Sequence, residues 1–489
     1  MKSLILGQLV LCSAPAWAAY DLNDFGRDVL NGRSSILIIG DSTNNPRGSS
    51  GFVPYYEGFL RRLPTTVPIC GFRVSESTGN TAVEHYVRFG GGSTDQFVDS
   101  RVNTRTPDDL LQGSVSLTIP GYRNEFTLLP QGTLPEFGRF ASIAMTDINR
   151  ICPAAATDWL GGTLGIRTVF VVDPEERYLG SFAVQPLSDH DGSAGDSIWG
   201  FEGGHIIDVE LVDDRWGLQP VDTVFENVPT SRIGVRFAGD TDQDDADEGG
   251  KSVSFGPVYF YSVDLLSAGR GLFYDSVSIG GYSAGDHART LTEGSLREYI
   301  LSSPRAPNWV VVWLGQNMDP DEWNGSLQPV FRDRIEVIAD TAVQAVAAAG
   351  SPPPRVLLVT PPAASGDYPS TRFSAAASEL NALAQTRGWV HLDLHELIGN
   401  SLASIDDNYT MDGVHPTLAG SEYVCDAIIA QLNCWRAELT GDDQLNIFDV
   451  QAYLGLFTTM DPRADFNGDD ELNVFDLMAY IDSFSAPCP

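Results

Sequence analysis

The chain has 489 residues, with 65 acidic side chains against 30 basic ones and a formal net charge of −35. A surface this acidic repels nucleic acid and anionic lipid, so neither is expected as a partner. The length exceeds that of one typical domain, and the sequence therefore predicts two or three.

The first 18 residues have the features of a secretory signal peptide. Lys2 precedes an apolar run from Leu4 to Leu11, and Ala16-Trp17-Ala18 is a small-x-small cleavage site. The run is too short to span a bilayer, and no later segment has about 18 consecutive apolar residues. We therefore expect a secreted, extracellular or cell-surface protein without a membrane span.

Export makes disulfides plausible, and five of the six cysteines lie beyond the leader. Cys434 and Cys488 bracket the last segment, and we predict that they pair. Cys70 with Cys152 is a further candidate pair. Cys425 lies on an apolar helix face and is expected to be a buried thiol.

The apolar run Ile36–Ile39 ends at Gly40-Asp41-Ser42. An apolar run of this length predicts a buried parallel strand, which would bring Ser42 to its carboxyl end. Ligands of open α/β sheets bind at that end, so Ser42 is a candidate nucleophile. The tripeptide alone indicates little, because it recurs in a loop at Gly195-Asp196-Ser197.

Further along the chain, two kinds of pattern follow each other. From 81 to 265, short β-rich segments such as 114–119, 168–172 and 206–211 alternate with turn residues, which predicts an inserted β-sandwich. From 266 onward, strands and helices alternate. Strands are expected at 275–281, 309–314, 356–360 and 389–394, and helices at 290–301, 332–349, 374–387 and 419–432. This alternation predicts a parallel sheet with helices on both faces, a three-layer α/β fold.

A polar loop before the last of these helices contains Asp412-Gly413-Val414-His415. A carboxylate three residues before a histidine can orient the imidazole, which can then take the proton from a serine hydroxyl. The sequence therefore predicts a catalytic Ser42, His415 and Asp412.

Hydrolysis through a tetrahedral intermediate also needs donors for the developing oxyanion. The side-chain amide of Asn317 follows the strand at 309–314, and the backbone N–H of Gly285 follows the strand before it. The Ser42 N–H would be the third donor. Gly281 is an alternative to Gly285.

These segments, in this order, resemble the four conserved blocks of the SGNH (GDSL-type) hydrolase superfamily. The matching segments are Gly40-Asp41-Ser42, Gly285, Gly315-Gln316-Asn317 and Asp412–His415. The resemblance implies a flavodoxin-like sheet, with Ser42 as nucleophile, His415 as base and Asp412 as its orienting partner, and an oxyanion hole of Ser42, Gly285 and Asn317. Met318 stands where many members carry an acidic residue. An SGNH fold without activity, serving as a binding scaffold, is the alternative.

Residues 438–453 recur at 465–480. Oxygen-bearing side chains in the second copy follow the spacing of a calcium loop, as Asp465, Asn467, Asp469, Asn473 and Asp476. The first copy is a poorer set, with Asp442, Asn446 and Asp449 preceded by Glu438 and Thr440. The segment resembles a dockerin, which implies bound Ca²⁺ and a cohesin-like partner or surface. A module this small needs metal and a disulfide to remain folded.

The sequence thus predicts a secreted serine esterase, with carbohydrate O-acetyl groups as the expected substrate and no cofactor for catalysis. The alternatives are a lipase or thioesterase of the same fold, or a non-catalytic carbohydrate-binding or adhesion protein. The expected segments are a signal peptide (1–18), a hydrolase domain in two parts (19–80 and 266–433), a β-rich insert (81–265) and a dockerin-like module (434–489).

Overall fold

The computed structural model describes residues 22–44, 52–75 and 271–485. Short gaps within these ranges lie at 33, 65–66, 68, 279, 366–368, 438, 441–444, 462–463 and 468–470. Between residues 83 and 267 it describes the strands alone. Ser197 and the predicted disulfide partners Cys152 and Cys488 lie outside the described residues. Cys425 is a buried free thiol, as expected.

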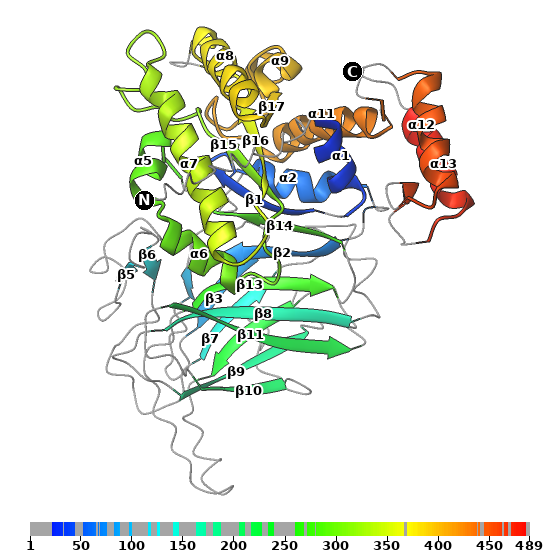
Figure 1. Ribbon diagram of the computed structural model, residues 1–489. Coiled ribbons are helices and arrows are strands. Elements are labelled where there is room, and N and C mark those ends of the chain that lie inside the picture. The colour runs from blue at the N-terminus through cyan, green and yellow to red at the C-terminus, as the bar shows by residue number, and fades with distance from the viewer. Residues whose placement is uncertain are drawn as a thin grey trace, which may run out of the picture.

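A nine-stranded sheet runs through the molecule in the order β11-β8-β13-β2-β14-β1-β15-β16-β17 (Figure 1). From β2 to β17 all neighbouring strands are parallel. These six strands are β1 (Ser35–Gly40), β2 (Ile69–Ser75), β14 (Leu272–Ser276), β15 (Trp309–Trp313), β16 (Arg355–Thr360) and β17 (Val390–Asp393). The predicted α/β fold class is confirmed.

Helices cover both faces of the parallel part, which explains its apolar strands. On one face lie α5 (Ala284–Thr290), α6 (Glu293–Ser302), α7 (Pro329–Ala348) and α8 (Ser370–Arg387). On the other lie α1 (Leu22–Leu30), α2 (Tyr55–Arg62) and α11 (Leu418–Arg436), and the short helices α9 (Leu394–Ile398) and α10 (Leu402–Ile405) precede α11. Successive side chains of a strand point to opposite faces. Leu37 and Ile39 therefore join the core beneath α7, while Ile36 and Ile38 are buried on the other side.

The insert is β-rich, and three of its strands extend the parallel sheet. β13 (Phe260–Ser267) pairs antiparallel with β2, and β8 (Thr163–Val172) and β11 (Gly217–Glu226) continue from it. The predicted boundary at residue 265 therefore falls within a strand of a continuous sheet.

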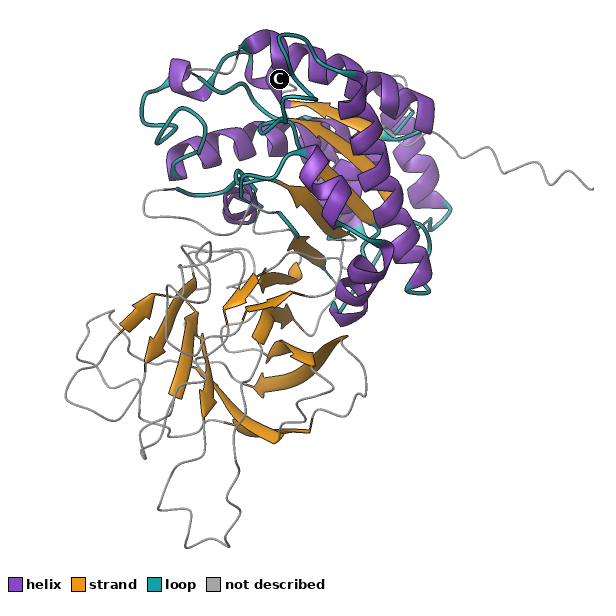
Figure 2. Cartoon of the chain, turned by 90° about the vertical axis from the view of Figure 1, so that its left-hand side faces the viewer, coloured by secondary structure: helices purple, strands orange, loops and turns teal. Residues whose placement is uncertain are grey.

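A second, antiparallel sheet of the insert has the order β10-β9-β12-β7-β3-β4, and Figure 2 shows the two groups of strands in the lower part of the molecule. Its strands are β3 (Val83–Arg88), β4 (Phe97–Asp99), β7 (Phe140–Met145), β9 (Leu179–Pro186), β10 (His205–Glu210) and β12 (Ile233–Ala238), and a hairpin is formed by β5 (Ser116–Thr118) and β6 (Glu125–Thr127).

The C-terminal repeat folds as two equivalent helices, α12 (Ile447–Thr458) and α13 (Val474–Phe484). Tyr453 and Tyr480 occupy corresponding positions and stack with ring centroids 4.1 Å apart. Both are fully buried in a small core of their own. Among the described helices of the whole chain, none is long and apolar enough to cross a bilayer.

Candidate active site

Ser42 lies in a tight turn at the carboxyl end of β1. The buried carboxylate of Asp41 accepts hydrogen bonds from the Thr43 N–H at 3.0 Å and the Thr43 hydroxyl at 2.8 Å. Burial raises the pKa of Asp41, and these two hydrogen bonds act in the opposite direction. Asp41 thus shapes the turn that presents Ser42.

Gly40 is required at the end of β1 because there is no room for a side chain. A Cβ at this position would lie 2.7 Å from Ser278 Oγ and 3.2 Å from the Trp313 carbonyl oxygen. Real Cβ atoms essentially never approach another heavy atom within 3.0 Å. The glycine of the Gly-Asp-Ser tripeptide is therefore a packing requirement.

The three predicted catalytic side chains form one hydrogen-bonded chain. Ser42 Oγ lies 3.0 Å from His415 Nε2, and His415 Nδ1 lies 2.7 Å from Asp412 Oδ2. An acid on one ring nitrogen and a hydroxyl on the other is the arrangement in which histidine can take a serine proton. The residues come from the end of β1 and from the loop before α11, 370 residues away, so only the fold brings them together.

The loop around Asp412 fixes the carboxylate before it meets the imidazole. Asp412 Oδ1 accepts the backbone N–H of Val414 at 3.0 Å and of His415 at 2.8 Å. Partial burial raises the pKa of Asp412, but the hydrogen bonds from His415 and Val414 outweigh it and lower the pKa below the ordinary value. Phe52 packs edge-on against the His415 ring, with centroids 5.0 Å apart.

Gly413 lets this loop close. Its φ of +86° lies in the left-handed region that favours glycine, and a Cβ there would lie 2.0 Å from Ser365 Oγ. The backbone conformation and the lack of space therefore both require glycine as the second residue of the Asp-Gly-Val-His segment.

Asn317 lies between the Ser42 turn and the loop after β14. Its side-chain Nδ2 donates to the Tyr282 carbonyl oxygen at 3.4 Å. Its backbone N–H acts on the Asp41 carboxylate, where it lowers the pKa. The Asn317 backbone is thus tied to the residue before Ser42, and its side chain to the loop after β14.

The prediction that the Gly285 N–H completes the oxyanion hole is wrong. That N–H donates to Glu322 Oε1 at 2.8 Å, and a Cβ at Gly285 would lie 2.6 Å from Asp319 Oδ2. Gly285 packs against the loop after β15 and is already paired. Gly281, the alternative, is exposed, has a φ of +79° and adjoins Tyr282.

Two residues that sequence reasoning missed hold these loops together. Glu322 is fully buried and accepts the N–H groups of Gly285 and Asp319, both at 2.8 Å. Arg334 of α7 donates to the same carboxylate at 2.8 Å. Burial raises the pKa of Glu322, and the Asp319 N–H and Arg334 oppose that rise. A single glutamate in a polar loop gives no sequence signal for this role.

The predicted calcium ligands are only partly described, because Asp442 and Asp469 lie outside the described residues. Asp476 is fully buried and accepts the N–H groups of Phe466, Asn467 and Asn473. Asp449 makes the equivalent bonds in the first copy, to Leu439, Thr440 and Asn446. The part of the chain that the structure describes contains no cluster of three or more His, Cys, Asp or Glu side chains suited to a metal.

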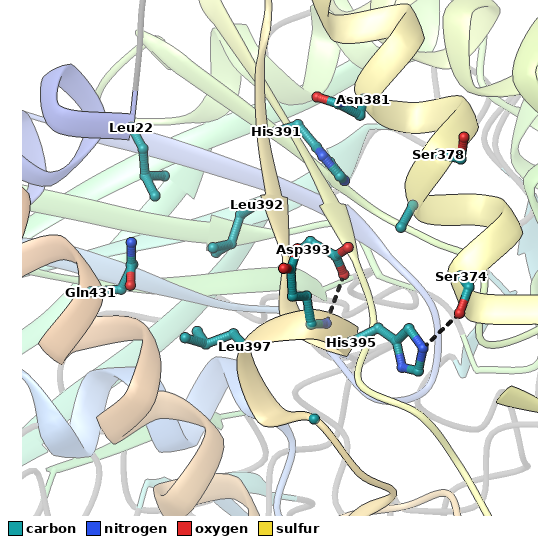
Figure 3. Close-up of a pocket in the computed structure, with 13 residues that line it drawn as sticks. Leu22, Ser374, Ser378, Asn381, His391, Leu392, Asp393, His395, Leu397 and Gln431 are labelled. Carbon is teal, nitrogen blue, oxygen red and sulfur yellow. Dashed lines mark hydrogen bonds between the residues drawn. The ribbon is translucent and has the colours of Figure 1, made fainter. Parts of the chain in front are cut away.

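A cavity of about 880 Å³ lies away from the triad, at the edge formed by β17 and between α8 and α9 (Figure 3). In it, Ser374 Oγ lies 3.0 Å from His395 Nε2, the same distance as in the Ser42–His415 pair. The His395 Nδ1 is buried without a partner among the described residues, and Asp393 instead accepts the Glu396 N–H. Ser374 therefore lacks the oriented base that Ser42 has.

No protein-family model matches the chain, and no curated protein matches it. Among solved structures it is similar to Est24, a carbohydrate acetylesterase from Sinorhizobium meliloti, with 17% identity over 32% of this chain and 76% of that one and a TM-score of 0.24. It is also similar to a family two carbohydrate esterase from Clostridium thermocellum in complex with cellohexaose, with 10% identity over 60% and 92% of the two chains and a TM-score of 0.25. An acetyl xylan esterase, AlAXEase, shows 19% identity over 38% and 85%, with a TM-score of 0.24. Because these identities and TM-scores are low, the function has to be inferred from the geometry of the site itself.

Proposed function

We propose that this protein is a secreted serine esterase of the SGNH type, which hydrolyses ester bonds through an acyl-enzyme intermediate. The observation that carries the proposal is the hydrogen-bonded chain from Ser42 through His415 to Asp412 at the carboxyl end of β1. Asn317 beside the same turn supports it, because acyl transfer needs a donor for the oxyanion.

The first half of the reaction transfers the acyl group to the enzyme. Ser42 Oγ attacks the ester carbonyl carbon while His415 Nε2 takes its proton, and Asp412 stabilises the imidazolium that forms. The tetrahedral oxyanion accepts hydrogen bonds from the Asn317 side chain and from backbone N–H groups of the Ser42 turn and Gly281. Collapse breaks the ester C–O bond, and the departing alcohol takes the proton from His415.

The second half repeats these steps with water. His415 takes a proton from water, the resulting hydroxide attacks the acyl carbon, and a second oxyanion forms in the same place. Its collapse releases the carboxylic acid and returns the proton to Ser42 Oγ. No metal or organic cofactor has a part in this scheme.

The substrate we propose is an O-acetylated polysaccharide. The side chains of His415 and Asp412 are 33% and 54% exposed, so a bulky alcohol can reach the reacting atoms at the surface. The expected export signal and C-terminal module support a polymer outside the cell as substrate.

A matched pair of serine variants tests the esterase proposal. With p-nitrophenyl acetate, Ser42→Ala should lower kcat by about 10³-fold or more, since the nucleophile is lost. Ser374→Ala removes a hydroxyl at the same distance from a histidine and should leave kcat unchanged. If the wild type and Ser42→Ala hydrolyse the ester equally, the proposal fails and the non-catalytic alternative takes its place.

The substrate class is tested separately. We expect acetyl esters to be cleaved faster than butyryl and longer esters, and acetate to be released from at least one of a panel of acetylated glycans. A preference for long acyl chains, with no acetate released from any glycan, would point to a lipase or thioesterase.

We further propose that the C-terminal module binds Ca²⁺ as a structural ion. Asp465 and Asp476 are buried, and both contribute, after burial itself, to a raised pKa of Tyr453. Carboxylate and amide oxygens at these spacings suit Ca²⁺. In the second copy the ion would be held by Asp465, Asn467, Asp469, Asn473 and Asp476.

The partner that we propose for this module is a cohesin-like protein or cell-surface anchor. Corresponding apolar side chains are exposed at the start of both helices, with Ile447 at 62% and Phe448 at 61% in one copy, and Val474 at 58% and Phe475 at 62% in the other. Exposed apolar residues at repeated positions are typical of a protein-binding surface.

A further inference from the structure

His287 is a buried histidine that the reaction scheme does not use. It lies in α5 and is fully buried, and its Nε2 is 2.8 Å from the carbonyl oxygen of Gly40. A carbonyl oxygen can only accept, so Nε2 must carry the hydrogen. Burial lowers the pKa of His287 to about 4, which keeps the ring neutral at neutral pH.

The Gly40 carbonyl lies just beyond the last residue pair between β1 and its neighbour β14. The Ile38 carbonyl accepts the Val277 N–H at 2.8 Å, and pairing of β1 with β14 ends at Ser276. Carbonyls two residues apart in a strand point the same way, so the Gly40 carbonyl also faces the β14 side. His287 therefore supplies the hydrogen bond that the sheet no longer provides.

This carbonyl belongs to the peptide group that joins Gly40 to Asp41, immediately before Ser42. On the other side of the strand, Gly40 remains in register with Trp313 of β15. Holding the carbonyl fixes the plane of that peptide, from which the Ser42 turn begins.

The same imidazole contacts the segment that carries the other donors. The His287 ring packs edge-on against Tyr282, with centroids 5.1 Å apart, and the Tyr282 carbonyl accepts the Asn317 side chain. α5 itself is anchored by a capping box between Ser283 and Asp286. His287 thus connects the end of β1 to the loop beside Asn317.

We propose that His287 is a positioning residue, which donates its Nε2–H to the Gly40 carbonyl and thereby aligns the Ser42 turn with the oxyanion donors of the 281–282 segment and Asn317. The inference rests on the proposed esterase function. This role differs from that of a purely structural core histidine in two ways. The hydrogen-bond donor must be at Nε2, and its loss must lower the rate of the chemical step.

Two amide substitutions separate these roles. In His287→Gln the side-chain NH₂ reaches about as far as Nε2 and can still donate to the Gly40 carbonyl, whereas in His287→Asn it ends near Nδ1 and cannot. We expect His287→Asn to lower kcat on the order of 10²-fold with little change in KM, since misplacement by about 1 Å has effects of that size. His287→Gln should restore most of kcat. Wild-type kcat in His287→Asn, or equal losses in both variants, would overturn the inference.

A measurement on the wild-type protein covers the case in which His287→Asn does not fold. ¹H–¹⁵N spectra of the histidine side chains, with the His287 signals assigned by their absence from His287→Gln, should show hydrogen on Nε2. Hydrogen on Nδ1 alone would overturn the inference. This measurement does not depend on activity. A wild type that cleaves no ester would contradict the proposed function, and the tautomer of His287 could still be measured.

Discussion

At the residue scale, Ser42 differs from other serines of the chain in what surrounds its hydroxyl. Ser374 also lies 3.0 Å from a histidine, yet His395 has no described carboxylate on its other nitrogen. His415 has Asp412 at 2.7 Å, and two backbone N–H groups hold that carboxylate in place. An oriented, ionised acid makes a histidine an effective base toward serine.

Asp412→Asn tests this orientation with almost no change in shape. The amide cannot act as the negative partner of the imidazolium and favours the wrong tautomer, so kcat should fall between about 10²- and 10⁴-fold. The measurement is the rate of p-nitrophenyl acetate hydrolysis at saturating substrate. Asp407→Asn, at an exposed aspartate of the same loop, is the control and should be unaffected. Equal activity of the two variants would remove Asp412 from the mechanism.

His287 should also make the protein less stable in acid. Its pKa is lowered on folding, from 6.5 to about 4, so between these values the unfolded state binds more protons than the folded one. Stability is then full above the unfolded pKa and declines as the pH falls toward 4. The loss attributable to this group is about 3 kcal/mol at most.

The change is measured as the difference in unfolding free energy between the wild type and His287→Gln at pH 7 and at pH 4. Asp41 and Glu322, whose pKa values are raised, act with the opposite sign in both proteins and cancel in this difference. We expect the wild type to lose more stability than the variant on acidification. A difference that does not change with pH would contradict the placement of His287 as a buried neutral group.

At the scale of elements, α5 and the loop after β15 are joined beside the candidate site. Glu322 ties the two together through the Gly285 and Asp319 N–H groups, and Arg334 balances its charge. Asn317 lies in the same loop. The ion pair of Glu322 and Arg334 therefore anchors the loop that contains Asn317.

Glu322→Gln should loosen this loop. The amide keeps the size of the side chain but loses the charge that faces Arg334 and the N–H groups, and breaking a buried pair costs about 3 to 5 kcal/mol. We expect a lower unfolding free energy by chemical denaturation, together with a lower kcat. Asp321→Asn is the matched control, because the Asp321 side chain pairs with the same guanidinium while 60% exposed. Similar losses in the two variants would show that burial of Glu322 is unimportant.

The sequence was a good guide to elements whose pattern is periodic or uniformly apolar. β1, β15, β16, α7, α8 and α11 lie within a few residues of the predicted ranges. α1 and β2 were not predicted, and β14 begins before the predicted strand. α5 was also missed, because its seven residues show no apolar period and it begins through the capping box of Ser283 and Asp286.

In the candidate site, too, the residues with a sequence pattern could be predicted and those without one could not. The hydrogen-bonded Ser42, His415 and Asp412 could be found from motif spacing, since the proposed chemistry requires particular residue types. The proposed backbone donor in the loop after β14 could not, because every residue except proline carries a backbone N–H. The Gly285 N–H is occupied because of where Glu322 lies, which only the folded chain determines.

At the scale of the whole molecule, the parallel strands and three antiparallel strands of the insert form one continuous sheet, while other strands of the insert form a second sheet. β2 pairs with β14 on one side and with β13 on the other. The insert is thereby fixed to the edge of the catalytic sheet by backbone hydrogen bonds. The C-terminal repeat has a separate core, built around the stacked Tyr453 and Tyr480.

Calcium should stabilise this repeat within the full chain. In thermal melts followed by circular dichroism, we expect a low-temperature transition in EGTA that moves upward when Ca²⁺ is added, since binding at 100 times Kd contributes about 2.7 kcal/mol. Asp476→Asn should weaken that response. Asp482→Asn, at an exposed position of α13, should not. Identical melts in EGTA and Ca²⁺ would contradict a structural calcium site.

The central claim, that Ser42 is the nucleophile of an ester hydrolase, is tested most directly by covalent trapping. The intact protein is treated with a fluorophosphonate, digested and analysed by mass spectrometry, in parallel with its esterase activity. We predict loss of activity together with one phosphonyl group on the peptide that contains Ser42, and much slower labelling in His415→Ala. Inactivation with the adduct on Ser374, Ser197 or any other residue, and none on Ser42, would contradict the account.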